Sequence, residues 1–370
     1  MNSIIYLGMD VHKETYNLCA YNNETGEICG ETKCKADIKL VIKFIENLKK
    51  TYGEDLVVKA GYEAGCLGYV PYHQLTKYGI DCDILAPTTM ARSSKEKLNK
   101  NDKLDARNIA TNLANGTYKS VYVPNDEDLA VKEYIRMLDD TKIARKKVKQ
   151  HINAFVLRQG YKYEGKSKWT IAHLEWLKTL PIIGLLRETL DEYLSQYDDL
   201  CNRIDRYGDK LIELSNEESY EQSISHLRCF KGIDTTAAMT VHVEISDFTR
   251  FLNACAFASY LGLTPGESSS GSKTTYLSIT KQGNTTVRNA LVESAQALVK
   301  GTPGIKSKAV KARQKGQDIK VIDYADKAVD RLQRKYRKLI NRGVHHNKAV
   351  VAVARELACF IWGMETGRIN

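Results

Sequence analysis

The chain has 370 residues, of which 43% are hydrophobic, and a formal net charge of +10. This length predicts two or three domains, and no segment has the uninterrupted apolar length of a membrane span. The start "MNSIIYLGMD" lacks the basic and apolar regions of a secretory signal, so we expect a cytoplasmic protein without a membrane partner. Nine cysteines without a Cys-x-x-Cys pair predict free thiols and argue against a zinc site.

Residues 1–124 predict an α/β domain. The segments "IIYLGMDVHK", "TYNLCAYN" and "EICGETKCKA" are typical of three strands of a meander, with a turn at "NETG". A helix is expected over residues 37–52, where apolar residues recur on one stripe. Two buried strands are expected, "DLVVKAGYEA" and "GIDCDILAP", each followed by a helix. The first of these helices should cover about residues 67–78. This order of elements is that of the ribonuclease H-like fold.

Residues 125–222 are expected to be helical almost throughout. Leu129–Leu157 and Ile182–Leu214 are long, periodic and charged, and the Gly- and Lys-containing loop "GYKYEGKSKW" lies between them. Two such helices facing one another predict an antiparallel coiled-coil arm, although the heptads are irregular. Residues 223–370 predict a third, mainly α domain, with a Gly/Ser-rich interruption over Thr264–Lys273.

Four acidic residues occupy positions that converge in a ribonuclease H-like sheet. Asp10 ends the first strand and Glu63 the fourth, whereas Asp102 and Asp105 begin a helix, three residues apart on one face. The two aspartates also suit a simpler interpretation, as solvated carboxylates at the positive end of the helix dipole. Four gathered carboxylates repel one another unless divalent cations lie between them. Oxygen ligands indicate Mg²⁺ or Mn²⁺, and two such ions can polarise a phosphodiester.

A second candidate site is the stretch "GESSSGSK". Three serines, Ser268–Ser270, precede Gly271 between two predicted helices. From composition alone, a flexible Ser/Gly loop is the simpler interpretation. A serine that attacks phosphorus needs nearby positive charge, which Lys273, Lys281 and Arg288 could supply.

The positive charge is concentrated in two places. The stretches "KIARKKVK", which contains Lys146 and Lys147, and "RLQRKYRKLINR" form basic stripes on predicted helices. Either stripe alone suits a solvated helix face, but both together favour a nucleic-acid partner. The segment "FKGIDTTAAMTVHVEI" resembles half of a helix-hairpin-helix element, whose backbone N–H groups suit phosphate.

The motifs together resemble the DEDD-type transposases of the insertion-sequence-110 family, which are related to the Piv-type DNA invertases. "GMDVHK", "YEAG" and "NDKLDARNIA" match the acidic motifs of the family, and "FASYLGLTPGESSSG" and "ITKQGNTTVRNAL" match its C-terminal motif. Lys231 and Asp234 depart from the usual Pro-Gly-Ile-Gly turn. The resemblance covers nearly the whole chain.

The resemblance implies a metal-dependent DNA recombinase. The N-terminal domain would be RuvC-like, with Asp10, Glu63, Asp102 and Asp105 as the metal-binding acids. In the family, the catalytic serine is the one directly before glycine. This position corresponds to Ser270 here, which would form a covalent phosphoserine link to DNA. The run of serines leaves Ser269 as an alternative nucleophile.

The resemblance also implies partners. These are donor and target DNA, a structured non-coding guide (bridge) RNA, and further copies of the chain, as a homodimer that assembles to a tetramer. Because the acids and the serine are far apart in sequence, we expect them to come from different domains. Two other functions remain open: a metal-only nuclease like the junction resolvases, and a non-catalytic nucleic-acid-binding protein.

Overall fold

The computed structural model describes residues 4–91, 101–270 and 273–369. The chain divides into two compact units, Met1–Val123 and Pro124–Asn370, and each is described by itself. The predicted domain boundaries, at residues 124 and 222, stay predictions.

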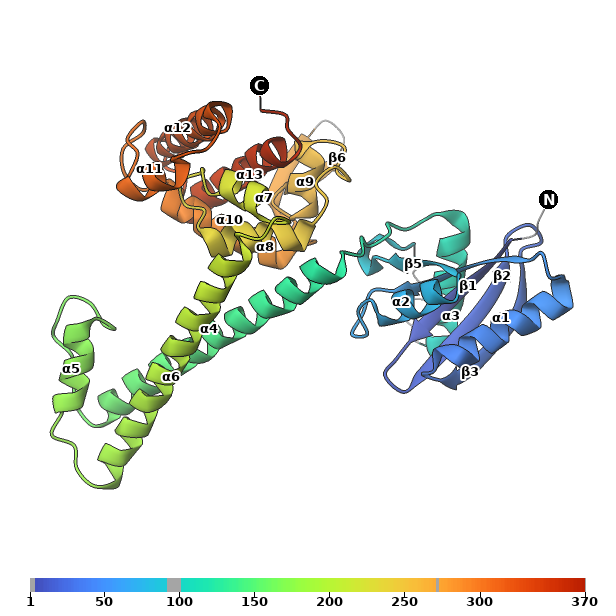
Figure 1. The fold of residues 1–370 in the computed structure, drawn as a ribbon, viewed down its shortest axis with the longest axis horizontal. Coiled ribbons are helices and arrows are strands. Elements are labelled where there is room, and N and C mark those ends of the chain that lie inside the picture. Colours follow the sequence, from blue (N-terminus) through green and yellow to red (C-terminus); the bar gives the residue numbers. More distant parts are fainter. Residues whose placement is uncertain (1–3, 92–100, 271–272, 370) are drawn as a thin grey trace. The chain divides into compact units, whose positions relative to one another are not determined.

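The first unit is a mixed five-stranded sheet with helices on both faces (Figure 1). Strands β1 (Ile4–Val11), β2 (Thr15–Asn22) and β3 (Glu27–Lys35) form an antiparallel meander, and β4 (Val57–Glu63) and β5 (Asp81–Leu85) continue the sheet in parallel with β1. The strand order is β3-β2-β1-β4-β5. Helix α1 (Ile38–Tyr52) follows β3, α2 (Val70–Lys77) follows β4, and the short η1 (Pro87–Thr89) and α3 (Asp102–Asn115) follow β5. The predicted order of elements is confirmed.

The two faces of the sheet differ in what covers them. The apolar stripe of α1 packs with Ile5, Leu7 and Met9 of β1 in the main core of this unit. Alternate residues of a strand point to opposite faces, so Gly8 lies on the other face, beneath α3. A Cβ atom at Gly8 would collide with the backbone of α3, which means that a glycine is needed for this close approach.

The second unit begins with two long helices, α4 (Asp126–Arg158) and α6 (Leu185–Leu214). Near one end Ile135 of α4 shares a core with Leu211 of α6, and near the other end Ile152 shares a core with Leu190. The helices therefore pack antiparallel, as expected, while their description as a coiled coil stays a prediction. The stretch "GYKYEGKSKW" is a loop, as expected, and the helix α5 (Ile171–Thr179), which Thr170 caps, lies between this loop and α6.

The rest of the second unit is a bundle of helices around α13 (His346–Glu365), which explains the long apolar run of that helix (Figure 1). Its other helices are α7 (Glu221–Leu227), α8 (Thr235–Ile245), α9 (Ala254–Tyr260), α10 (Thr285–Leu298), α11 (Lys308–Gln314) and α12 (Ile319–Asn341). The expectation of a loop over the Gly/Ser-rich stretch was wrong, because β6 (Pro265–Ser270) and β7 (Lys273–Ile279) form an antiparallel hairpin there. In the part of the chain that the structure describes, no helix is long and apolar enough to cross a membrane.

Candidate active site

Two of the predicted acids lie at the ends of neighbouring parallel strands, Asp10 as the second-last residue of β1 and Glu63 as the last residue of β4. Met9 of β1 pairs with Tyr62 of β4, so Asp10 and Glu63 each follow at the same edge of the sheet. Gly61 lies two residues before Glu63 and faces Leu113 of α3, as Gly8 before Asp10 faces the backbone of that helix. A two-residue step keeps a side chain on the same face of a strand. Both acids thus belong to the face that α3 covers.

The other two acids begin α3. Asn101 caps this helix by accepting a hydrogen bond from the backbone N–H of Lys103, at 3.0 Å. Asp102 and Asp105 fill the first turn, where carboxylates also offset the helix dipole. Because Gly8 lets α3 lie against β1, the start of this helix is brought toward the end of that strand.

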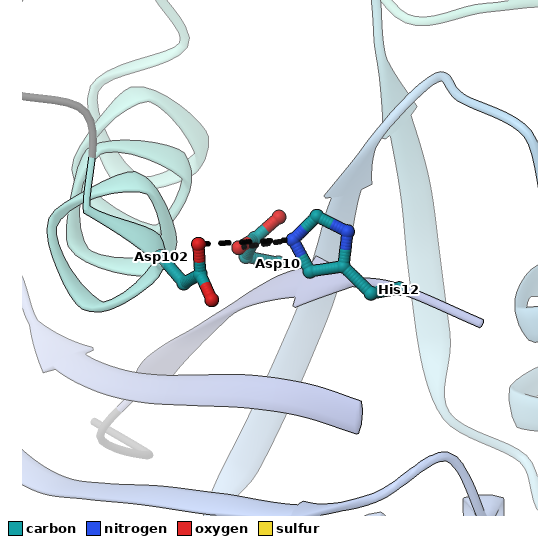
Figure 2. A group of neighbouring side chains, drawn as sticks. All are labelled: Asp10, His12 and Asp102. Carbon is teal, nitrogen blue, oxygen red and sulfur yellow. Dashed lines mark hydrogen bonds and ion pairs between the residues drawn. The ribbon is translucent and has the colours of Figure 1, made fainter. Parts of the chain in front are cut away.

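Asp10, His12 and Asp102 form a compact group (Figure 2). The Nε2 atom of His12 lies 3.2 Å from Oδ2 of Asp10 and 3.9 Å from Oδ1 of Asp102. One ligand atom from each residue lies within 4.8 Å of the others, which is compatible with a shared metal ion. Sequence reasoning did not single out His12. Its i, i+2 spacing from Asp10 at a strand end was the available signal.

The charges in this group favour a cation. Burial raises the pKa of the Asp10 carboxyl above its ordinary value, and the nearby carboxylates of Asp102 and Asp105 raise it further, while His12 lowers it. The side chain of Asp10 is 16% exposed, whereas those of His12 and Asp102 are about half exposed. A divalent cation would relieve the repulsion that the buried carboxylate experiences. The two carboxylates therefore fit the predicted Mg²⁺ or Mn²⁺.

Not every predicted acid lies in this group. Asp105 acts on Asp10 electrostatically, which puts it in the same neighbourhood. Glu63 ends the adjacent strand but is not one of the three residues whose ligand atoms cluster within 4.8 Å, among the residues that the structure describes. The structure thus groups Asp10 and Asp102 with His12, and the roles of all four acids stay predictions.

A charged contact holds α3 to the sheet. Glu31 of β3 accepts two hydrogen bonds from Arg107, one of them 2.8 Å long, and pairs with Lys103 at 2.9 Å. The hydrogen bonds from Arg107 lower the pKa of Glu31 to about 2, and Lys103 contributes in the same direction. Because Lys103 directly follows Asp102, this contact orients the start of α3.

A cavity of about 440 Å³ adjoins Asp102. Asn17 lies at its wall, opposite Asp10 in the pairing of β1 with β2. Asn17 is 7% exposed, and its Nδ2 atom is buried without a hydrogen-bond partner among the described residues. An unpaired buried donor of this kind is costly to the fold.

The predicted nucleophile lies in the second unit, at the end of the β6–β7 hairpin. Ser270 is the last residue of β6 and pairs with Lys273, the first residue of β7, while Gly271 lies outside the described residues. The register thus puts the backbones of Ser270 and Lys273 opposite one another.

Lys281 follows the hairpin in a left-handed backbone conformation, with φ of 57°, and its side chain is exposed. Its backbone N–H donates to the carbonyl of Gly262 at 3.1 Å. Gly283, two residues on, has no room for a Cβ atom, because its backbone contacts Tyr260. These contacts fix the backbone from which Lys281 projects into solvent.

Arg288 lies in a different environment from the one expected for a phosphate contact. Its side chain is buried at 8% exposure and donates to the carbonyl of Leu261 at 2.8 Å and to the hydroxyl of Thr285 at 2.9 Å. Arg288 therefore holds α10 against the preceding segment. A bound phosphate would have to displace these hydrogen bonds.

Lys231 and Asp234, which depart from the Pro-Gly-Ile-Gly pattern, both have structural roles. Asp234 caps α8 by accepting from the backbone N–H of Ala237 at 2.8 Å. Lys231 donates to the carbonyl of Lys300. Gly232 between them has a φ of 92° and contacts the backbone of α10. This turn therefore leads into α8, packs against α10 and is hydrogen-bonded to the segment after α10.

Lys146 and Lys147 lie on α4 with exposed side chains. Among the residues described, neither forms an ion pair. Lys149, by contrast, sits over the rings of Trp169 and Tyr197, at 5.0 and 5.5 Å from their centroids. The basic stripe of α4 thus contains both solvent-exposed cations and a packed one.

Known proteins match most of this chain. Residues 7–161 match a family model of transposases of the DEDD type, and residues 224–309 match the family "Transposase IS116/IS110/IS902". The transposase for insertion sequence element IS1533 of Leptospira borgpetersenii is 31% identical, over 92% of this chain and 97% of the relative. The putative transposase y4qE of Sinorhizobium fredii is 31% identical, over 82% and 74%. The transposase for insertion sequence element IS1111A of Coxiella burnetii is 23% identical, over 99% and 91%.

Proposed function

The chain belongs to the IS116/IS110/IS902 family of transposases, and we propose that it cuts and rejoins DNA with a carboxylate-bound metal and a serine nucleophile. The observation that carries the first half is the group of Asp10, His12 and Asp102 beneath the start of α3. The second half depends on the serine of the family's C-terminal motif, which in this chain is Ser270.

Asp10, Asp102 and Asp105, together with Glu63 from the adjacent strand, would hold Mg²⁺ or Mn²⁺. The bound metal would supply positive charge to the phosphodiester under attack. The chain's own residues do the positioning. Gly8 allows α3 to approach β1, and the contact of Glu31 with Arg107 fixes α3 on the sheet. Asp10 is the most buried of the three clustered side chains, so its geometry is the least free to change.

The proposed covalent step transfers a phosphoryl group from DNA to protein. The Oγ atom of Ser270 forms a bond to phosphorus as the bond from phosphorus to one sugar oxygen breaks. The proton that the serine hydroxyl loses is balanced by the proton that the released sugar hydroxyl gains. The reverse reaction with another strand end rejoins the DNA and regenerates the serine. Lys281, exposed beside the hairpin, is suited to offset phosphate charge.

The proposed partners are DNA and a structured non-coding guide RNA. Lys146 and Lys147 are both exposed on α4, and their charge supports the binding of a polyanion there. We also propose a homodimer that assembles to a tetramer. Apolar side chains exposed on α4, such as Ile143 at 53%, are candidates for a contact between copies. A monomeric mass in solution, both with and without nucleic acid, would contradict this assembly.

A denaturing gel of labelled DNA tests the chemistry directly. The wild-type protein should leave a DNA adduct that protease shortens, and Ser270→Ala should remove it, whereas the matched Ser269→Ala should retain it. Asp10→Ala and EDTA should each abolish the adduct. Loss only in Ser269→Ala would move the nucleophile by one residue. Cleavage without any adduct in the wild type would favour the metal-only nuclease.

A further inference from the structure

The C-terminal half of α12 has a groove of about 640 Å³ along it. The groove is lined by cationic and polar side chains of the helix and by the short segment that follows α10: Thr302, Pro303, Arg334, Arg337, Lys338, Asn341 and Arg342. No acidic residue contributes to this lining. We propose that the groove binds the phosphate backbone of duplex DNA. This binding role rests on the proposed function, since it presumes that DNA is the substrate.

The helical spacing puts the cations on one face. Arg334, Lys338 and Arg342 follow each other at steps of four residues, and Arg337 lies three residues after Arg334, so all four side chains line one side of the helix. The opposite side is apolar and buried, with Leu332 fully enclosed in the core. The basic face is therefore held outward by packing behind it.

The facing wall of the groove is also fixed. Gln333 is buried and donates to the carbonyls of Leu298 and Lys300, at 2.7 and 3.1 Å. Arg337 donates to the carbonyl of Gly301 at 3.0 Å. These hydrogen bonds tie the start of the segment that carries Thr302 and Pro303 to α12. Several hydrogen bonds thus hold the two walls of the groove together, and its shape does not depend on one mobile side chain.

The cations of α12 and its C-cap differ in what they contact. Arg331 and Lys335 both pair with Glu356 of α13, so their charge is used inside the protein. In the groove, Arg334 pairs with Asp330 at 2.9 Å. Lys338 and Arg342 are exposed, and neither has an ion-pair partner within the described ranges. Their charge is therefore available to a ligand.

The chemistry of this lining selects a phosphate backbone. Exposed Lys and Arg gain free energy when they displace the counterions condensed on duplex DNA. The groove is open to solvent, and every charged side chain that lines it is cationic, so contacts to phosphate are favoured over contacts to base edges. Binding here should position DNA without reading its sequence.

The test uses the full chain and a fluorescent DNA duplex of random sequence. The double variant Lys338→Gln, Arg342→Gln should weaken binding at least about tenfold at low salt. It should also reduce the slope of log K against log salt by about 1.8, or about 0.9 per lost phosphate contact. Lys338→Arg with Arg342→Lys should keep the wild-type slope. The matched control is Lys320→Gln, an exposed cation on the same helix but about 27 Å from Lys338 along its axis.

Each outcome decides the proposal. An unchanged slope in the folded double variant, checked by circular dichroism, overturns it, as does an equal loss in Lys320→Gln. If only the affinity for an RNA duplex falls, the assignment to DNA is overturned. Because affinity is measured without cleavage, the result is separate from that of Ser270→Ala. A DNA adduct that survives in Ser270→Ala rejects the nucleophile and leaves the groove standing.

Discussion

The Nε2 atom of His12 lies 3.2 Å from Oδ2 of Asp10, on the side from which the first turn of α3 approaches. A neutral imidazole in this place can ligate a metal or orient the carboxylate that does so. Either role would make His12 a functional residue beside the four predicted acids. It lies directly after β1, where the sheet fixes the backbone up to Val11.

We predict that His12→Ala lowers DNA cleavage by about 10- to 100-fold, because loss of a residue that orients a metal ligand has an effect of this size. The fold should be unchanged, since the imidazole is half exposed. The measurement is the cleavage rate at increasing Mn²⁺, which should partly restore the variant. Lys13→Ala, a change at the neighbouring exposed residue, is the control. Equal rates for the two variants would show that His12 has no special role.

A second prediction concerns the partly buried carboxyl group of Asp10. Its pKa is raised in the folded protein by burial and by Asp102 and Asp105. A raised pKa means that the protonated form is favoured on folding, so this stabilising contribution is present below about pH 4 and is lost as the pH rises through the folded value. Asp10→Asn should therefore raise the melting temperature of the metal-free protein at pH 7, but not at pH 4, while abolishing cleavage.

With metal bound, the wild type should instead melt at a higher temperature than Asp10→Asn. Added Mg²⁺ or Mn²⁺ at 100 times its dissociation constant should stabilise the wild type by about 2.7 kcal/mol, and Asp10→Asn much less. Thermal melts with and without the ion measure both effects. A wild-type protein that melts at the same temperature in EDTA and in excess metal would be incompatible with the proposed centre.

A third prediction concerns the contact that fixes α3. Hydrogen bonds from Arg107 lower the pKa of Glu31 from 4.5 to about 2, so its stabilising contribution is present above pH 4.5 and is lost as the pH falls toward 2. Glu31→Gln should cost about 1–2 kcal/mol at pH 7 and flatten the fall in stability over that range. Urea titrations across this range measure it. Glu27→Gln, an exposed change on the same strand, should behave like the wild type.

The sequence was sufficient for the order of elements in the first unit, because strands and helices there have clear periodicity and Gly-containing turns. The helix expected over residues 67–78 begins only at Val70, with Pro71 in its first turn, a position that proline favours. The four acids were predicted because each lies near the end of a strand or in the first turn of a helix, and their roles stay predictions. His12 was missed, since an exposed histidine after a strand has no periodic signal.

The second unit was harder to predict for a physical reason. Arg288 is charged, and sequence alone gives no sign that its guanidinium is buried against the carbonyl of Leu261. The segment after Thr264 is rich in serine and glycine, which favours a loop, yet pairing of β6 with β7 makes it a hairpin. The alternation in "KTTYLSI" was the available signal for β7. In both cases tertiary partners decide the outcome over local composition.

The last prediction separates binding from packing within one basic stripe. Lys146 and Lys147 are exposed on α4, whereas Lys149 lies over Trp169 and Tyr197 and has a lowered pKa because of its burial and the nearby Arg145. Changing Lys146 and Lys147 to alanine should reduce the salt slope for structured RNA by about 0.9 per phosphate contact and leave the melting temperature unchanged.

Lys149→Ala should do the opposite. Loss of the two cation–π contacts should cost about 1–2 kcal/mol of stability and change the salt slope little, because Lys149 is already occupied by the two rings. Fluorescence titrations between about 50 and 200 mM salt, with thermal melts of the same samples, measure both quantities. If Lys149→Ala lowers the slope as much as the exposed pair does, the packed cation also reaches the nucleic acid. If the exposed pair leaves the slope unchanged, α4 is not part of the RNA-binding surface, and the basic stripe is a solvated helix face.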